Sequence, residues 1–287
     1  MGTEPEPPHK KWEDKLAELM RAMEFRHPDG PRFLATIKAG DLETVKRMVQ
    51  SNRDLLFVAD DYYGSPVRAA ADTHPEIGDY LARLEAQRLR EGSVPEVWLY
   101  GAIHDLGEAA HAGSQYPGSE ALRTDSEPVV AGFLTHNDPQ IRRIAVSVLS
   151  VHWDMKQYVQ TFRVIGLNDP DESVRQYAVH SVGWLLRGSR DRDASRFLLG
   201  IFKDPIQPAW IRKTAYHGLE EIWQGFDVGH AKFVRKLRPK DAARAEAEKR
   251  DTAAETMRLG SGRGIAWEEF VDWEFIGRVE QATGKDG

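Results

Sequence analysis

The sequence of 287 residues contains no cysteine, which excludes disulfide bonds and thiolate chemistry. It also lacks any apolar run close to the roughly 20 residues that a membrane-spanning helix needs. The first residues are acidic and rich in proline, unlike the basic and then apolar segments of a secretory signal. We therefore expect a protein without a membrane span that resides in the cytoplasm.

Motifs that mark common reactions are absent as well. The sequence has no glycine-rich phosphate loop ahead of a helix and no Gly-x-Ser-x-Gly elbow. It also has no clustered pair of carboxylates that would define an acid–base site. We therefore predict that the protein is not an enzyme, has no catalytic residues and needs no cofactor.

Charge is distributed unevenly along the chain. The net charge is −6, but residues 138–238 hold 16 Lys and Arg against 11 Asp and Glu, a balance of 16 − 11 = +5. The remainder therefore carries −6 − 5 = −11. A mildly basic segment in an acidic chain can meet an acidic partner or a phosphate backbone, although this balance is ordinary for a hundred residues.

A short pattern, aliphatic-Arg-x-x-Ala, recurs in the second half of the chain at Ile141–Ala145, Val174–Ala178 and Ile211–Ala215. Each copy follows an Asp-Pro turn, and an aliphatic residue comes four positions after its Ala. The copies start 174 − 141 = 33 and 211 − 174 = 37 residues apart. This pattern predicts helical hairpins, each with a second helix that starts after the turn, at Asp171 or Glu172 in the middle copy.

These hairpins resemble HEAT repeats, especially the short kind found in phycobilin-lyase-like proteins. The resemblance covers roughly a hundred residues and implies an all-α fold, an α-solenoid of stacked helical hairpins. It also implies that the repeated residues, Asp138, Asp169, Asp204, Arg142, Arg175 and Arg212, stabilise the stacking of the units and do not form a binding site.

Nearer the N-terminus, Gly40–Lys46 and Ser65–Arg68 resemble parts of an ankyrin repeat pair, with two short helices that meet at Gly40-Asp41. The second unit departs from that family because His74 stands where a glycine belongs. Two such units are fewer than the three or so that stack stably alone, so we expect them to pack on neighbouring helices.

Four regions follow from this organisation. Residues 1–28 are an N-terminal extension and helix, and residues 29–90 are the ankyrin-like repeats. Residues 91–237 are the HEAT-like array, and residues 238–287 are a charged helix, a glycine-rich hinge and an aromatic C-terminal helix. Gly113–Ser126 is rich in Gly, Ser and Pro, and we predict a loop there.

Candidate binding residues are those that stacking does not explain. His180 and His217 occupy equivalent positions in two repeats, and exposed tryptophans on a solenoid are good anchors for a partner. The aromatic C-terminal segment must dock on this chain, on a partner or on another copy. We predict a partner-binding set of Arg143, His180, Trp184, Trp210, His217, Trp267, Phe270 and Trp273.

One further group has the chemistry of metal ligands. His104, Glu108 and His111 fall at i, i+4 and i+7 on one face of a predicted helix over 94–110. The spacing differs from the zincin pattern, which has two histidines one turn apart and a third ligand elsewhere. We therefore predict no metal site.

The most favoured function is a non-catalytic protein–protein interaction scaffold, because proteins of this kind resemble bacterial immunity or adaptor proteins that bind one cognate partner. The oligomeric state stays open. A first alternative is nucleic-acid binding: Ile141–Ala145 and Gly183–Arg187 are similar to stretches of the alkylpurine DNA glycosylases, but Gln157 stands where that family has its catalytic Asp. A second alternative is a bilin-lyase-like enzyme.

Overall fold

A computed structural model describes residues 27–58, 65–71, 73–112, 118–224 and 271–284 of the chain. Within these ranges the protein consists of helices and turns, without a β-strand. The predicted fold class is confirmed: the structure is all-α, and helices pack against their neighbours as in a HEAT-like solenoid. The chain divides into two compact units, Met1–Asp154 (unit 1) and Met155–Gly287 (unit 2).

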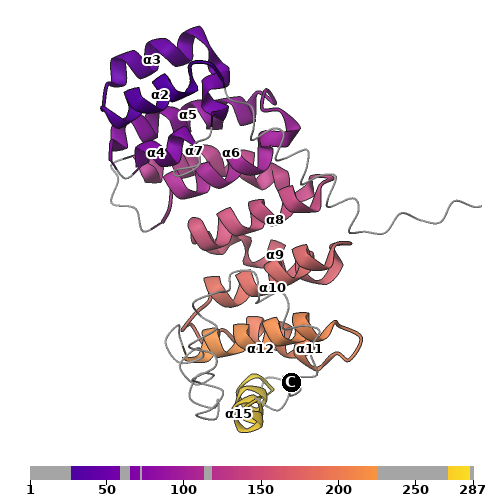
Figure 1. The fold of residues 1–287 in the computed structure, drawn as a ribbon. Helices are drawn as coiled ribbons and strands as arrows, with labels where there is room; N and C mark the ends of the chain where they lie inside the picture. The colour runs from indigo at the N-terminus through magenta and orange to yellow at the C-terminus, as the bar shows by residue number, and fades with distance from the viewer. Residues whose placement is uncertain (1–26, 59–64, 72, 113–117, 225–270, 285–287) are drawn as a thin grey trace, which may run out of the picture. The chain divides into compact units, whose positions relative to one another are not determined.

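Unit 1 is a series of helices of 3 to 16 residues (Figure 1). In chain order these are α2 (Gly30–Lys38), α3 (Leu42–Ser51), η1 (Arg53–Phe57), α4 (Pro66–Ala71), α5 (Pro75–Arg90), α6 (Glu96–Ala109), α7 (Ser119–Gly132), η2 (Phe133–Thr135), α8 (Pro139–Ser147) and η3 (Val148–His152). Their core is aliphatic, with Leu81, Ile103 and Leu106 fully buried.

The turn between α2 and α3 forms where the sequence predicts it. Gly40 has φ +74°, a left-handed conformation that glycine adopts without strain. The Asp41 side chain then accepts a hydrogen bond from the Thr44 N–H at 3.0 Å and caps α3. The two predicted short helices are therefore confirmed, while the ankyrin resemblance itself stays a prediction.

The loop predicted over Gly113–Ser126 is wrong in its second half. Helix α7 begins at Ser119, directly after Gly118, whose φ of +134° turns the chain. Leu122 and Val130 are buried on one side of α7, so tertiary packing outweighs the loop-like composition.

Unit 2 is built from two antiparallel hairpins and a final helix. The elements are η4 (Lys156–Tyr158), α9 (Val159–Asn168), α10 (Glu172–Leu185), α11 (Arg192–Lys203), α12 (Ala209–Gln224) and α15 (Trp273–Thr283). Helix α10 packs against both α9 and α12, and α11 packs against α12. The predicted start of the middle second helix is confirmed, with Asp171 as its cap.

The repeated Asp and Arg residues stabilise the turns of the hairpins. Each Asp accepts a hydrogen bond from a backbone N–H two residues later. Arg142 and Arg175 donate to a backbone carbonyl just before their own helices, whereas Arg212 donates to a carbonyl in the last turn of α11. The Asp bonds are Asp138 to Gln140 at 2.8 Å, Asp169 to Asp171 at 2.9 Å and Asp204 to Ile206 at 2.9 Å. The Arg bonds are Arg142 to His136 and Arg175 to Asp169, both at 2.8 Å, and Arg212 to Phe202 at 3.0 Å.

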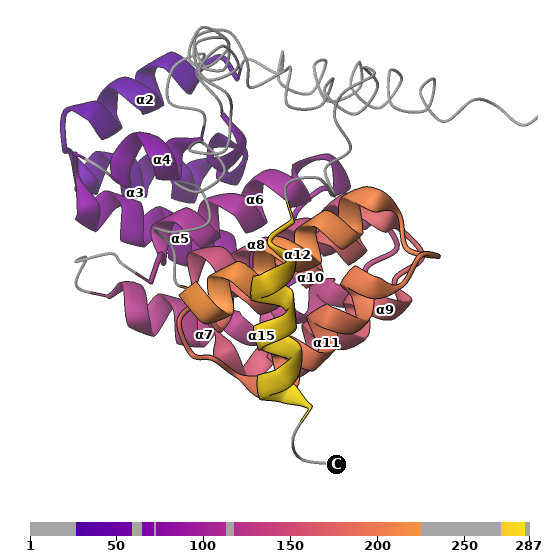
Figure 2. The same cartoon turned by 90° about the horizontal axis from the view of Figure 1, so that it is seen from below.

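The C-terminal helix α15 docks on the α11–α12 hairpin of the same chain (Figure 2). Phe275, Ile276 and Val279 are buried on its inner side. At its start, the Asp272 backbone N–H donates to the Tyr216 hydroxyl at 3.1 Å. The predicted helices over Lys10–Arg26 and Arg238–Leu259 lie outside the described residues.

Candidate functional site

Helix α10 carries a row of ring side chains, of which Tyr177 is exposed and His180 and Trp184 are half-buried. Tyr177, His180 and Trp184 stand at i, i+3 and i+7, while Val174, Ala178 and Val182 on the opposite side are fully buried. The ring centre of His180 lies 6.5 Å from that of Tyr177 and 6.1 Å from that of Trp184. The Arg187 guanidinium lies 4.9 Å from the Trp184 ring centre, a cation–π contact that orients both side chains.

Helix α12, which packs against α10, carries Trp210 and His217, and His217 is close enough to His180 to influence it. The two helices are joined at this level by a hydrogen bond of 3.1 Å from the Gln176 amide to the Thr214 hydroxyl. Burial lowers the pKa of His180, and the neighbouring His217 lowers it further. We call Tyr177, His180, Trp184, Trp210 and His217 the α10–α12 aromatic face.

Two glycines allow α10 and α12 to approach so closely. A Cβ added at Gly183 would lie 2.5 Å from the Cα of Gly218 and 2.8 Å from Glu221 Oε2. Glu221 is half-buried at this contact, and burial raises its pKa to about 7, although Arg187 opposes the shift. The Glu221 carboxyl therefore exchanges its proton near neutral pH and carries only part of a negative charge there.

The turn before α12 contributes an apolar residue that sequence reasoning missed. Ile206 is 88% exposed, and Trp210, four residues later, is 37% exposed. The sequence does contain a sign of a longer turn here, because the second and third repeats start 37 residues apart and the first two only 33. The additional residues form a turn that lifts Ile206 away from the core.

The other predicted binding residues belong to other elements or lie outside the described residues. Arg143 is half-buried on α8 of unit 1. Trp273 begins α15, where it is 59% exposed, and its ring centre lies 5.8 Å from that of Phe202. Trp267 and Phe270 lie outside the described residues.

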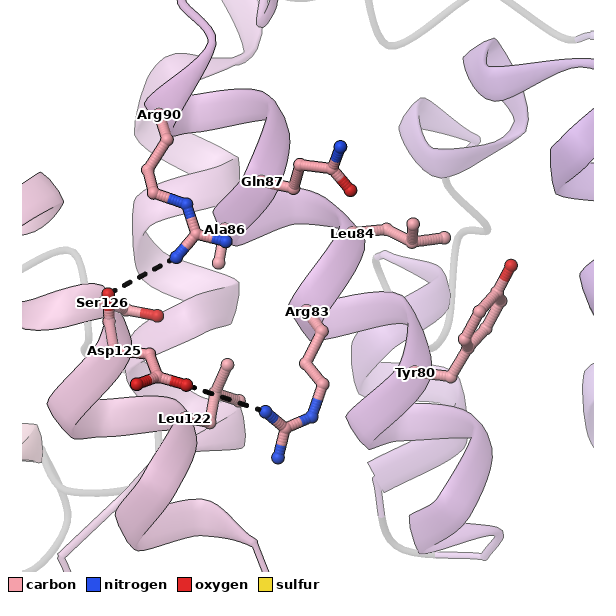
Figure 3. Close-up of a pocket in the computed structure, with 9 residues that line it drawn as sticks. All are labelled: Tyr80, Arg83, Leu84, Ala86, Gln87, Arg90, Leu122, Asp125 and Ser126. Carbon is pink, nitrogen blue, oxygen red and sulfur yellow. Dashed lines mark hydrogen bonds and ion pairs between the residues drawn. The ribbon is translucent and has the colours of Figure 1, made fainter.

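Unit 1 has a groove of about 250 Å³ between α5 and α7. Figure 3 shows Arg83 and Asp125 pointing toward each other across it, with Arg83 Nη1 3.9 Å from Asp125 Oδ2. Arg90 donates to the Asp125 backbone carbonyl at 3.4 Å. These contacts connect the two helices, so the groove belongs to their packing.

A second cluster in unit 1 contains His104 and Glu108 of α6 and His152 at the end of η3. Each residue offers one metal-ligand atom, and these atoms lie within 4.8 Å of one another. Sequence reasoning grouped His104 and Glu108 with His111 and missed His152. Nothing local could have revealed it, because the fold alone brings His152 to α6.

Comparison with known proteins places the repeats in a family. Residues 126–220 match the family model for HEAT repeats, from within α7 to within α12. The match therefore includes all three copies of the repeated pattern. The chain is a helical protein that carries HEAT repeats, and such repeats generally mediate protein–protein interaction.

One curated relative is the zinc finger CCCH-type antiviral protein 1 of Rattus norvegicus, which is 28% identical over 153 residues. The matched segment covers 50% of this chain and 20% of that protein, so the chain spans a small part of the relative's length. A CCCH finger needs cysteine ligands, and this sequence has none. No solved structure matches the chain. Among the described residues, no helix is both long and apolar enough to span a bilayer.

Proposed function

We propose that the chain is a non-catalytic scaffold that binds one protein partner on the α10–α12 aromatic face. The observation that carries this proposal is the exposure of Tyr177 and Trp210, each 37%, together with half-buried Trp184 on two adjacent helices of unit 2. Tyr, Trp and Arg supply most of the binding energy at protein interfaces. The face combines the three residue types, because Arg187 stacks on Trp184.

The charges around the face favour a partner with an apolar ridge flanked by acidic groups. Arg187 and Lys213 are exposed beside it, whereas Glu220 is buried. Burial raises the pKa of Glu221 to about 7, which removes part of its negative charge near neutral pH. Complementary charge of this kind accelerates association and fixes the orientation of the partner.

The finer features of the proposal come from the sequence. We propose a bacterial immunity or adaptor protein that acts in the cytoplasm and binds one cognate partner, by fold-level analogy with compact bacterial proteins of this kind. Nucleic-acid binding by the basic repeats and a bilin-lyase-like activity are the competing proposals.

The experiment is site-specific photo-crosslinking in the native host, with the photoreactive residue placed at Trp210 or, as a control, at Leu167. Leu167 is 52% exposed on α9, a helix that contributes no residue to the face, so both positions are accessible and tolerate substitution. We expect one protein to crosslink at position 210 and not at 167. The Trp210→Ala and Ile206→Ser variants should reduce its recovery when the crosslinker stands at Tyr177.

Equal crosslinking at positions 210 and 167 would refute the α10–α12 aromatic face as the interface. Recovery of nucleic acid instead, with retention that falls steeply as salt is added, would favour the competing proposal.

A further inference from the structure

Two helical turns of unit 1 bring three metal-ligand side chains together. Glu108 Oε1 lies 3.2 Å from His152 Nδ1 and 3.9 Å from His104 Nε2. In a tetrahedral site with bonds of about 2.0–2.1 Å, neighbouring ligand atoms lie roughly 3.3 Å apart. The first distance already suits such a site, and the second needs an adjustment of roughly 0.6 Å, within the reach of side-chain rotation.

The backbone holds His152 against α6. Residues Val148–His152 form a π-helical turn, closed by a hydrogen bond of 2.9 Å from the Trp153 N–H to the Val148 carbonyl. The His152 carbonyl accepts a bond of 2.6 Å from the Ala112 N–H, just after α6. A Cβ added at Gly107 would lie 2.7 Å from Val148 Cγ2, so glycine is needed for this approach. π-turns of this type occur frequently at functional sites.

The His152 imidazole is largely buried and turns Nδ1 toward the other two ligands. Its side chain is 13% exposed, and Nδ1 has no hydrogen-bond partner among the described residues, although Glu108 lies nearby. A metal ion binds a neutral imidazole through the ring nitrogen that carries no proton.

One cation opposes a metal at this position. Arg68 Nη2 lies 2.8 Å from His104 Nδ1 and 3.2 Å from its Nε2, and Arg68 Nε lies 3.3 Å from Asp105 Oδ1. An arginine only donates hydrogen bonds, so it contacts a ring nitrogen with a free lone pair. Metal bound at Nε2 would move the proton to Nδ1, which faces Asp105 at 3.9 Å, and Arg68 would then have to move away.

We propose that His104 Nε2, Glu108 Oε1 and His152 Nδ1 bind one divalent transition-metal ion of the zinc class. Two imidazole nitrogens and one carboxylate oxygen suit Zn²⁺, Co²⁺, Ni²⁺ or Cu²⁺ better than Mg²⁺ or Ca²⁺. The His111 ring centre lies 6.0 Å from that of His152, but His111 is not among the residues whose ligand atoms come together. The ion would connect α6 to η3. This proposal replaces our prediction from the sequence that the chain has no metal site.

The test is calorimetric titration of the untagged full-length chain with Zn²⁺, together with visible absorption spectra after Co²⁺ addition. We expect one saturable site and the intense absorption of tetrahedral or five-coordinate Co²⁺. His152→Ala and the near-isosteric Glu108→Gln should weaken Zn²⁺ binding at least on the order of 10–100-fold, the range that changes outside the ligand set alone produce. Arg68→Met should tighten it, because a cation next to the ion is removed.

The matched control is His217→Ala. His217 Nδ1 also lies 3.2 Å from a carboxylate, that of Glu220, but among the residues that the structure describes no third ligand completes a set there. This variant should bind Zn²⁺ like the wild type. Circular dichroism melts of each metal-free variant separate lost ligands from lost folding, and Glu108→Gln should melt like the wild type. Equal affinity of wild type and Glu108→Gln, or no saturable site in the wild type, would overturn the proposal.

Discussion

The docking of α15 on the α11–α12 hairpin can be tested by removing one buried ring. Phe275 is 4% exposed, and its ring centre lies 6.4 Å from that of Tyr216 in an edge-to-face arrangement. Truncating a buried Phe to Ala typically lowers the free energy of unfolding by about 3–5 kcal/mol, because both apolar burial and packing are lost. We therefore expect Phe275→Ala to destabilise unit 2.

The free energy of unfolding that Phe275→Ala can remove has an upper limit. Helix α15 can detach while the two hairpins of unit 2 stay folded, so the variant cannot lose more stability than docking of α15 provides. If docking provides at least 3 kcal/mol, at about 4 °C per kcal/mol the melting temperature should fall by about 12 °C. If the melting temperature falls by less than this while the amide protons of α15 lose all protection from exchange, docking of α15 provides less than about 3 kcal/mol.

The assay combines thermal melts with amide hydrogen exchange of α15. Trp273→Ala is the control, because Trp273 is on the same helix but 59% exposed, and it should change the melting temperature little. If Phe275→Ala melts and exchanges like the wild type, α15 does not dock through this ring and the cis docking is refuted.

Two further predictions concern the contact between α10 and α12. Gly183→Ala should lower the free energy of unfolding by about 1–3 kcal/mol or more, because its Cβ would lie 2.5 Å from a backbone atom of Gly218. The control is Gly277→Ala on α15, where an added Cβ meets nothing within 4 Å, so this variant should be neutral or stabilising. Equal urea midpoints for the two variants would contradict the predicted effect of Gly183→Ala. Folded Glu221 keeps its proton up to a pKa of about 7, whereas the unfolded chain releases it near 4.5, so its contribution to stability is lost as pH rises through this interval. The difference of 7 − 4.5 = 2.5 pH units corresponds to roughly 3 kcal/mol of folding stability. In urea titrations, Glu221→Gln should remove this loss of stability between pH 5 and pH 8. If the variant keeps the pH dependence of the wild type, Glu221 is not its source.

Local chemistry made most of the repeats predictable from the sequence. The Asp-Pro turns and the aliphatic-Arg-x-x-Ala pattern act within a few residues, and α10 begins at Glu172 as they indicate. Composition misled at α7, because Leu122 is buried by helices distant in sequence. The meeting of His152 with Glu108 was out of reach for the same reason, since it depends on how η3 packs on α6.

The proposed metal site arises where the first repeat departs from the other two. Seven residues after the repeated Ala, the second and third repeats have Leu185 and Ile222, which are 1% and 0% exposed. The first repeat has His152 at this position. Its helix α8 ends after nine residues, whereas α10 and α12 continue for 14 and 16, and the chain enters the π turn instead.

In the first repeat, the His152 imidazole therefore replaces a buried aliphatic side chain, and a π turn replaces the regular α-helix at the same place. A repeat optimised only for stacking would keep both the helix and the aliphatic side chain, as its two siblings do. Local rules that are broken together tend to mark functional positions, because stability has been given up there for another purpose. In this chain the repeated Asp and Arg residues stabilise the hairpins, and the exception in the first repeat, His152, belongs to the proposed metal site.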